Sequence, residues 1–231
     1  YYIAIKDGKK AIFHKDGKRI SQWFDWIWES GLVKGESEYY VAAKNEKWAI
    51  FDVNGKMVTK EWYDYVSLDG LVEGQSKYYI AVKDEKYAIF DVNGEKITEW
   101  YDDISSEGLV KGQSNLYVAK KDGKYAIFNI YGRQISDWYD GISLYGLVKG
   151  ESDYYVACKD KKCAVYHKDG KKVSKDFAGK YLYAYKINFN ENLGIVEMFD
   201  KKGNLIKSVD FNPVYPRKKE EFLDYTKLLN I

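Results

Sequence analysis

Short runs of β-branched and aromatic residues, separated by turn residues, make up most of the chain. Tyr78–Lys83 and Lys86–Asp91 are two such runs, and only Asp84-Glu85 lies between them. Runs of this length that are rich in Tyr, Ile, Val and Phe favour β-strands. The pair therefore predicts a β-hairpin closed by a two-residue turn.

Further extended segments follow this hairpin. Asn93-Gly94 predicts a second tight turn, of type I′, in which both central residues take positive φ. Glu95–Trp100 then predicts a third strand and Tyr101–Ser105 a fourth. No window before Pro213 has the 3.6-residue period of a helix. The hydrophobic pattern therefore predicts an all-β fold.

The whole pattern recurs along the chain. The tripeptide Ala88-Ile89-Phe90 has counterparts at steps of 38 or 39 residues. They are Ala11-Ile12-Phe13, Ala49-Ile50-Phe51, Ala126-Ile127-Phe128 and Ala164-Val165-Tyr166. A turn glycine follows each copy, and the first four continue with a Trp-aromatic-Asp set, a Gly-Leu-Val segment and a Gly-Glu/Gln-Ser segment. The chain is therefore a tandem repeat, with copies near residues 1–38, 39–77, 78–115, 116–153 and 154–186 and a degenerate copy at 187–212.

Residues 1–212 are expected to form one repeat domain. A small sheet of three or four strands cannot bury both of its faces alone, so neighbouring copies must stack. Radial stacking gives a β-propeller, and linear stacking gives an open β-solenoid. Because closure removes long sheet edges, we favour a propeller of six blades, with five blades or the open solenoid as alternatives.

The last segment, residues 213–231, has a different pattern. Pro213 and Pro216 precede Arg217–Leu229, a stretch in which Phe222, Tyr225, Leu228 and Leu229 have the spacing of an amphipathic helix. A proline near the first turn suits the start of a helix. This segment predicts a C-terminal helical cap.

Composition limits the classes of partner. The chain has 37 Lys+Arg and 35 Asp+Glu, and its net charge of +2 gives no general footprint for nucleic acid. No apolar run approaches the ~20 residues that a membrane-spanning helix needs. Aromatic residues make up 17% of the chain, which argues against disorder. We therefore expect a folded protein with no nucleic-acid partner and no membrane span.

The repeat resembles a known family. Lys86–Ile97 reads Lys-Tyr-Ala-Ile-Phe-Asp-Val-Asn-Gly-Glu-Lys-Ile, and Trp100–Ile104 and Glu107–Leu109 follow it. This run resembles the bacterial WG repeat over roughly residues 1–178, with alanine in place of the repeat glycine, as in Tyr87-Ala88. The resemblance implies an interaction scaffold without a catalytic constellation.

Lysines bracket each first hairpin turn. The pairs are Lys6 and Lys9, Lys44 and Lys47, Lys83 and Lys86, Lys121 and Lys124, and Lys159 and Lys162. Like charges that face each other across a hairpin cost stability, and turn residues such as Asn45 and Asp84 are expected to offset that cost. Lysine tips are ordinary solubilising features, but a row of them also suits an anionic partner. On the second interpretation the candidate binding residues are Lys44, Lys47, Lys83, Lys86, Lys121 and Lys124.

Aromatic side chains have two possible roles. The repeated Trp-aromatic-Asp sets favour a structural role, because a buried aromatic removes a large apolar area from water. Their Asp residues then accept hydrogen bonds at a strand end. The first copy alone adds Trp26 and Trp28, which are candidates for a binding surface, with packing at a sheet edge as the alternative.

Cys158 and Cys163 flank a hairpin turn and are expected to face each other on adjacent strands. We expect free thiols that fill the core, with a cross-strand disulfide second and metal ligation last. Two cysteines favour a reducing interior such as the cytoplasm. The start at Tyr1, inside a repeat, indicates a trimmed chain, so the compartment is left open.

Catalytic motifs do not accompany the repeats. The sequence has no glycine-rich phosphate loop, no serine elbow and no His-Glu-x-x-His. His14 and His167 occupy the position at which other copies carry Asp52, Asp91 and Asn129, which indicates a role in a turn.

The leading hypothesis is therefore a non-catalytic scaffold that binds another protein and needs no cofactor. A carbohydrate- or cell-wall-binding module that uses Trp26 and Trp28 is the alternative. A third hypothesis, an enzyme, requires a cleft lined by non-repeated polar residues between Asp176 and Asp210.

Overall fold

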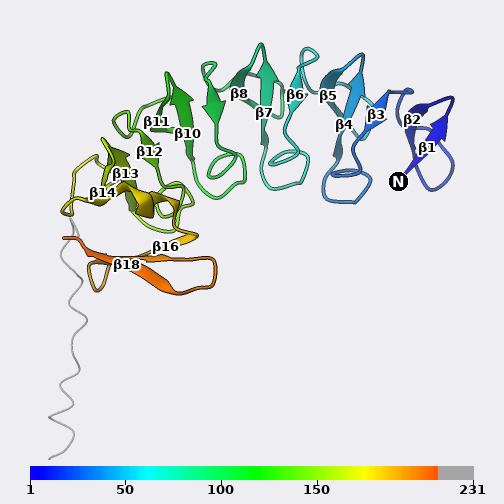
Figure 1. Cartoon of the computed structure of the whole chain (residues 1–231). Coiled ribbons are helices and arrows are strands. Elements are labelled where there is room, and N and C mark those ends of the chain that lie inside the picture. The colour runs from blue at the N-terminus through cyan, green and yellow to red at the C-terminus, as the bar shows by residue number, and fades with distance from the viewer. Residues whose placement is uncertain (213–231) are drawn as a thin grey trace, which may run out of the picture. The chain divides into compact units, whose positions relative to one another are not determined.

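The computed structural model describes residues 1–212, which form two compact units (Figure 1). The N-terminal unit comprises Tyr1–Asp140 and Val148–Gly150, and the C-terminal unit comprises Gly141–Leu147 and the described residues from Glu151 onward. The helical cap expected at residues 213–231 lies outside the described residues. One short helix occurs in the described part, the 3-10 helix η1 at Gly179–Tyr183, and the sequence pattern does not predict it.

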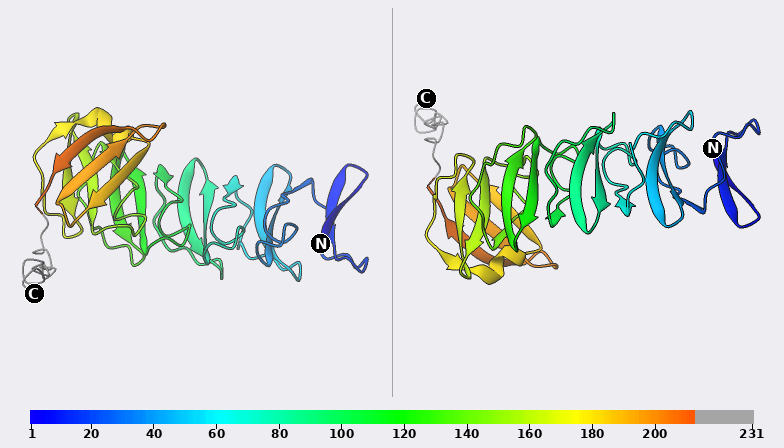
Figure 2. Two further views of the ribbon diagram at one scale, coloured as in Figure 1. Left: turned by 90° about the horizontal axis from the view of Figure 1, so that it is seen from below. Right: turned by 90° about the horizontal axis from the view of Figure 1, so that it is seen from above.

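The N-terminal unit contains four small antiparallel sheets, one after another along the chain. The first is β1 (Tyr2–Lys6) and β2 (Lys9–Phe13); the second is β3 (Trp26–Ile27), β4 (Tyr39–Lys44) and β5 (Lys47–Asp52); the third is β6 (Tyr65–Val66), β7 (Tyr78–Lys83) and β8 (Lys86–Asp91); the fourth is β9 (Asp103–Ile104), β10 (Leu116–Lys121) and β11 (Lys124–Asn129). Within this unit the sheets lie side by side in that order (Figures 1 and 2).

The C-terminal unit contains two more sheets. The fifth is β12 (Gly141–Ile142), β13 (Tyr154–Lys159), β14 (Lys162–His167) and β15 (Phe177–Ala178), and the sixth is β16 (Lys186–Asn190), β17 (Ile195–Phe199) and β18 (Leu205–Asp210). The prediction of an all-β fold built from small tandem sheets is confirmed, and residues 1–212 hold six sheets, as many as the predicted blades.

The type I′ turns lie at the first hairpin of each of the first five copies. Asp84 and Glu85 both have positive φ, 51° and 61°, as that turn requires. At Asn93-Gly94 only the glycine does, with φ 73°, and its N–H donates to the carbonyl of Asp91. The type I′ turn predicted at Asn93-Gly94 is therefore wrong, because the loop there is one residue longer and needs a single glycine at its end.

The third strand expected at Glu95–Trp100 does not form. Isolated pairings remain near its two ends, at Lys96 and at Tyr101. Between them the Thr98 hydroxyl accepts the N–H of Ile89 at 3.0 Å, in place of a backbone carbonyl. Ser21, Ser136 and Ser174 accept the matching N–H in other copies, at 2.8, 2.9 and 2.9 Å. A recurring hydroxyl thus interrupts the ladder.

The segment expected as a fourth strand, Tyr101–Ser105, belongs to the following sheet. Its central residues form β9, in which Ile104 lies opposite Ala119 of β10. The connections to the second and third sheets do the same, since Ile27 lies opposite Ala42 and Val66 opposite Ala81. The second, third and fourth sheets therefore take their first strand from the connecting segment that precedes their hairpin.

The strands of the middle sheets are buried on both faces. On β7, Tyr79 and Ala81 pack towards the second sheet, whereas Tyr78 and Ile80 pack towards the fourth. Each hydrophobic cluster of the N-terminal unit combines residues of two successive sheets. The sheets are consequently stabilised by their neighbours, as expected for a repeat protein.

Candidate functional site

The carboxylates of the Trp-aromatic-Asp sets join successive hairpin tips. The Asp64 carboxylate accepts the Asp84 N–H of the next hairpin at 2.8 Å and pairs with Lys47 of the preceding hairpin. Asp25 and Asp102 make the same contacts with Asn45 N–H and Lys9, and with Asp122 N–H and Lys86, respectively. These hydrogen bonds, first that from Lys47 and then that from Asp84 N–H, hold the pKa of Asp64 below its ordinary value. We call each such set of contacts an aspartate clip.

The clips change the interpretation of the lysine row. Lys47, Lys86 and Lys124 each pair with the Asp of their own copy, and Lys83 pairs with Glu61 at 2.6 Å. Lys44 contributes to the field that lowers the pKa of Asp25. Lys121 lies opposite Lys124 at an exposed tip. The direct ion pairs thus come from carboxylates of the connecting segments, and the turn residue Asp84 adds its field at Lys83, as expected from the sequence.

The aromatic members of the same sets are structural, as predicted. Tyr63 is buried between the second and third sheets, and Trp62 and Trp100 pack against the edges of neighbouring clusters. Burial raises the pKa of Tyr63 to about 12. Of the aromatic residues in these sets, none offers an open platform for a ligand.

Trp26 and Trp28 are different, because they remain exposed. Their exposed fractions are 46% and 36%, and their rings meet at 76° with centroids 6.5 Å apart. Trp28 stacks on Trp48 at 5.9 Å, and Ala43, which lies opposite both Trp26 and Trp48, leaves room above the sheet. We call Trp26, Trp28 and Trp48 the tryptophan patch.

A lysine ammonium is seated on this patch. Lys10 Nζ lies 3.1 Å from the ring centroid of Trp26, which is a close cation–π contact. The position of Trp28 is occupied in later copies by the serines Ser67, Ser105 and Ser143, and that of Trp26 by Tyr65, Asp103 and Gly141. The tryptophans are thus additions to the repeat.

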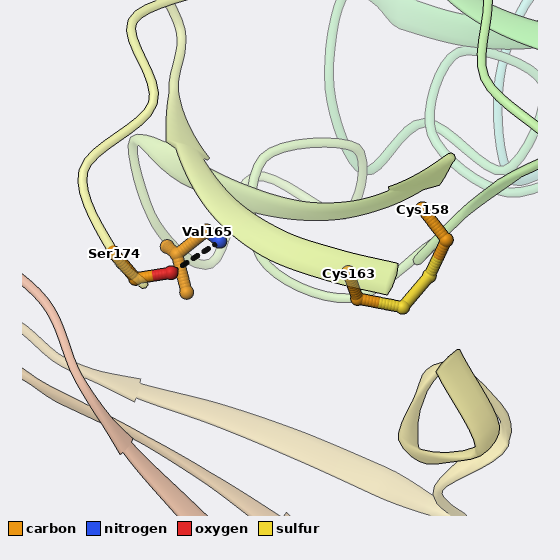
Figure 3. The surroundings of a disulfide bond; sticks show 4 residues. All are labelled: Cys158, Cys163, Val165 and Ser174. Carbon is orange, nitrogen blue, oxygen red and sulfur yellow. Dashed lines mark hydrogen bonds between the residues drawn. A yellow bond between two sulfur atoms is a disulfide. The ribbon is translucent and has the colours of Figure 1, made fainter. Parts of the chain in front are cut away.

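The two cysteines form a disulfide between β13 and β14 (Figure 3). They lie opposite each other, as predicted, and their Cα atoms are 3.9 Å apart. The expectation of free thiols is therefore wrong, because the pairing brings the two side chains within bonding distance. Among residues 1–212 no group of three His, Cys, Asp or Glu side chains is placed to hold a metal ion.

The two histidines take part in turns. Asp16 N–H faces His14 Nδ1 at 3.5 Å, and Asp169 N–H faces His167 Nδ1 at 3.4 Å. In other copies a carboxylate or amide oxygen receives the matching N–H, as Asp52 Oδ1 does from Asn54. The role in a turn predicted from the sequence is confirmed.

An open groove in the C-terminal unit runs between residues 171–177 and 207–212. Its charged side chains are Lys171, Lys172, Lys175, Asp176, Lys207 and Asp210. Lys172 Nζ pairs with Asp176 at 2.6 Å, and this hydrogen bond raises the pKa of Lys172. A lysine held in its charged form is a poor base or nucleophile. In residues 1–212 no helix is long and apolar enough to cross a bilayer.

Known proteins give only distant likenesses. No family model and no curated protein matches the chain. Among solved structures, BamB from Moraxella catarrhalis is 12% identical over 89% of this chain and 71% of its own, with a TM-score of 0.36. Kluyveromyces lactis Hsv2 is 14% identical over 85% and 66%, with a TM-score of 0.40. The designed protein Ika4 is 16% identical over 62% and 86%, with a TM-score of 0.30. No family membership follows from likenesses at this level.

Proposed function

We propose that this chain is a non-catalytic protein-interaction scaffold that binds another protein through the tryptophan patch. The observation that carries the proposal is the exposure of Trp26 and Trp28 at positions where later copies of the repeat carry other residues. Tryptophans that the repeat does not need for packing, placed on a firmly stacked sheet, are typical of binding hot spots. The resemblance to WG repeats, as interaction modules, agrees with this function.

The geometry of the patch favours a protein over a carbohydrate. A sugar ring stacks on an open, flat aromatic face, but Lys10 covers one face of Trp26 and Trp48 covers one face of Trp28. The two rings are also close to perpendicular, so they do not form a common platform. A side chain inserted beside the ring edges would bury apolar surface and meet the Lys10 ammonium.

The test compares binding by the unchanged chain with binding by two variants, Trp26→Asp and Trp28→Ser. Each carries the residue of a later copy, and Tyr131→Ala, at an exposed tyrosine of the fourth copy, is the control. We expect a protein captured by the unchanged chain and by the control to be lost with both tryptophan variants. Capture that survives both variants contradicts the proposal. Saturable binding to cellulose, chitin or peptidoglycan that requires Trp26 and Trp28 would instead favour the carbohydrate-binding module.

A further inference from the structure

One face and one edge of the first sheet are open, although the matching face and edge are covered in the second, third and fourth sheets. In the second, third and fourth sheets the face towards the preceding copy carries a fully buried tyrosine, at Tyr40, Tyr79 and Tyr117, with exposures of 0%, 0% and 1%. The equivalent residue of the first sheet, Tyr2, is 47% exposed. Tyr2 stacks on Phe13, and the Phe13 ring meets the Trp23 ring at 60° with centroids 6.1 Å apart, so the aromatic half of an inter-sheet core is already assembled.

The backbone edge beside this face is also open. The outer edges of β4, β7 and β10 pair with the two-residue strands β3, β6 and β9. Within residues 1–212, β1 pairs only with β2. Ala4 and Ile5 occupy the positions that Ala81 and Val82 fill in β7, where Val66 and Tyr65 lie opposite them.

The hairpin tip of the first sheet is shaped for an aspartate clip. Asn45, Asp84 and Asp122 have φ of 52°, 51° and 50°, and each donates its N–H to the carboxylate of the preceding connecting segment at 2.7 to 2.8 Å. Asp7 has φ of 51°, so its N–H is presented in the same way. No carboxylate in the described part of the chain accepts it.

The loop that contains Gly35 also lacks a neighbour that the equivalent loops of later copies have. A Cβ at Gly74, Gly112 or Gly150 would come within 3.0 Å of a carbonyl oxygen from the preceding connecting segment, that of Glu36, Gln75 or Gln113. Gly35 has the same backbone conformation, with φ of 75°, and meets nothing within 4 Å. The space beside Gly35 is the space that one more connecting segment would fill.

We propose that the open side of the first sheet is a docking site for another repeat of this chain's own type. The occupant is defined by the interfaces that the N-terminal unit already contains, because this face continues them. It needs an aspartate to accept Asp7 N–H, a two-residue strand with an aliphatic second residue to pair with Ala4 and Ile5, and a Gly-Leu-Val loop that ends beside Gly35. Residues 61–77 of this chain have that pattern.

The test joins a copy of residues 39–77 directly in front of Tyr1, which keeps the register of the repeat. The tether raises the effective concentration of the occupant without a new contact. In hydrogen-exchange measurements, we expect the Asp7 amide to slow at least tenfold, towards the rate of the Asn45 amide. The fluorescence of Trp23 should shift to shorter wavelength.

A matched control carries the same extension with two changes in the copy, the counterparts of Asp64→Ala and Val66→Asp. It should leave exchange at Asp7 fast, and unchanged exchange at Asn45 shows that the remaining sheets stay folded. Equal protection by both extensions, or by neither, overturns the proposal. Protection of Asp7 that grows with concentration in the unextended chain also overturns it, because a second copy of the chain would then be the occupant.

Discussion

At the scale of single residues, one carboxylate per copy holds two hairpin tips together. Asp25, Asp64 and Asp102 each accept an N–H from the next hairpin and pair with a lysine of their own copy. An aspartate whose position differs by one residue would reach neither partner. This explains why the Asp follows the aromatic pair without variation in the first four copies.

The clips predict a loss of stability in acid. The pKa values of Asp25, Asp64 and Asp102 lie below the ordinary 3.8 in the folded protein. Their contribution is therefore complete above about pH 4 and is lost as the pH falls through the lower, folded values. We expect the urea concentration at the unfolding midpoint to decrease as the pH is lowered below 4. The decrease should be smaller in a variant that combines Asp25→Asn, Asp64→Asn and Asp102→Asn. Exposed Asp137→Asn is the control and should leave the profile unchanged.

Alanine substitutions at two glycines distinguish the cost of backbone strain from the cost of a steric clash. Gly35→Ala places a side chain at positive φ in open space and should cost about 1 kcal/mol of unfolding free energy. Gly74→Ala adds a Cβ that meets the Glu36 carbonyl of the adjacent loop, so its cost should be at least twice as large. Urea unfolding of the two variants measures the difference. Equal costs would mean that the loops do not pack as described.

At the scale of elements, a side-chain hydroxyl replaces a backbone carbonyl beside β8 and so interrupts the strand expected at Glu95–Trp100. Thr98 is buried, and its Oγ1 accepts the N–H of Ile89 in the centre of β8. The same offset of nine residues separates acceptor from donor in the first, fourth and fifth copies, whereas the equivalent hydroxyl of the second copy, Thr59, has no hydrogen-bond partner. The repetition is visible in the sequence, but the hydrogen bond that the hydroxyl accepts is evident only from the structure.

This bond predicts the effect of removing the hydroxyl. Thr98→Val keeps the shape of the side chain but leaves the buried Ile89 N–H without an acceptor, which should cost about 1–3 kcal/mol. Thr98→Ser retains the acceptor, as Ser21 and Ser136 do, and should cost clearly less. Chemical denaturation compares the two, and a Val variant as stable as the Ser variant would contradict the role assigned to Thr98.

The hairpins and the repeat could be predicted from sequence because their signals are local. Alternating apolar residues and a two-residue spacing define the pair Tyr78–Lys83 and Lys86–Asp91, and both strands form with these bounds. The pairing of the connecting segments could not be predicted, because Asp103-Ile104 has the same extended pattern whether it pairs with its own hairpin or with the next one. Their pairing depends on stacking between copies, which periodicity does not encode.

The candidate site was only partly predictable for the same reason. The additional Trp26 and Trp28 are evident on comparing copies, and both are exposed. The pairing of Lys86 with Asp102 and of Lys47 with Asp64 joins residues 16 or 17 positions apart in the chain. Only the crossing of each connecting segment from one sheet to the next explains these contacts.

At the scale of the whole molecule, the N-terminal unit has a line of buried tyrosines between its sheets. Tyr40, Tyr79 and Tyr117 occupy the same position in three copies, and burial raises the pKa of each hydroxyl above its ordinary value of 10. Each ring stacks on the phenylalanine opposite it in the same sheet. That phenylalanine also contacts an aromatic ring of the preceding copy, which is Phe24, Tyr63 or Tyr101, so the aromatic contacts continue from copy to copy.

These tyrosines predict a loss of stability in alkali. Above pH 10 the unfolded chain releases the hydroxyl protons while the folded protein retains them, so unfolding is favoured as the pH rises. Each tyrosine contributes up to about 1.4 kcal/mol per pH unit. We expect Tyr79→Phe to reduce the slope of unfolding free energy against pH between 10 and 12 by about one such step. Tyr131→Phe, at an exposed position, should not change it.

Because each connecting segment strengthens the sheet that follows it, the unit of sequence and the unit of structure are out of phase. A chain shortened between Ser76 and Tyr78 ends at a natural boundary of the sequence repeat, yet it separates β6 from the hairpin that β6 completes. A cut near Lys60 instead keeps every sheet whole on both sides. Anyone who lengthens, shortens or recombines this protein should therefore place the junctions just before the Trp-aromatic-Asp sets.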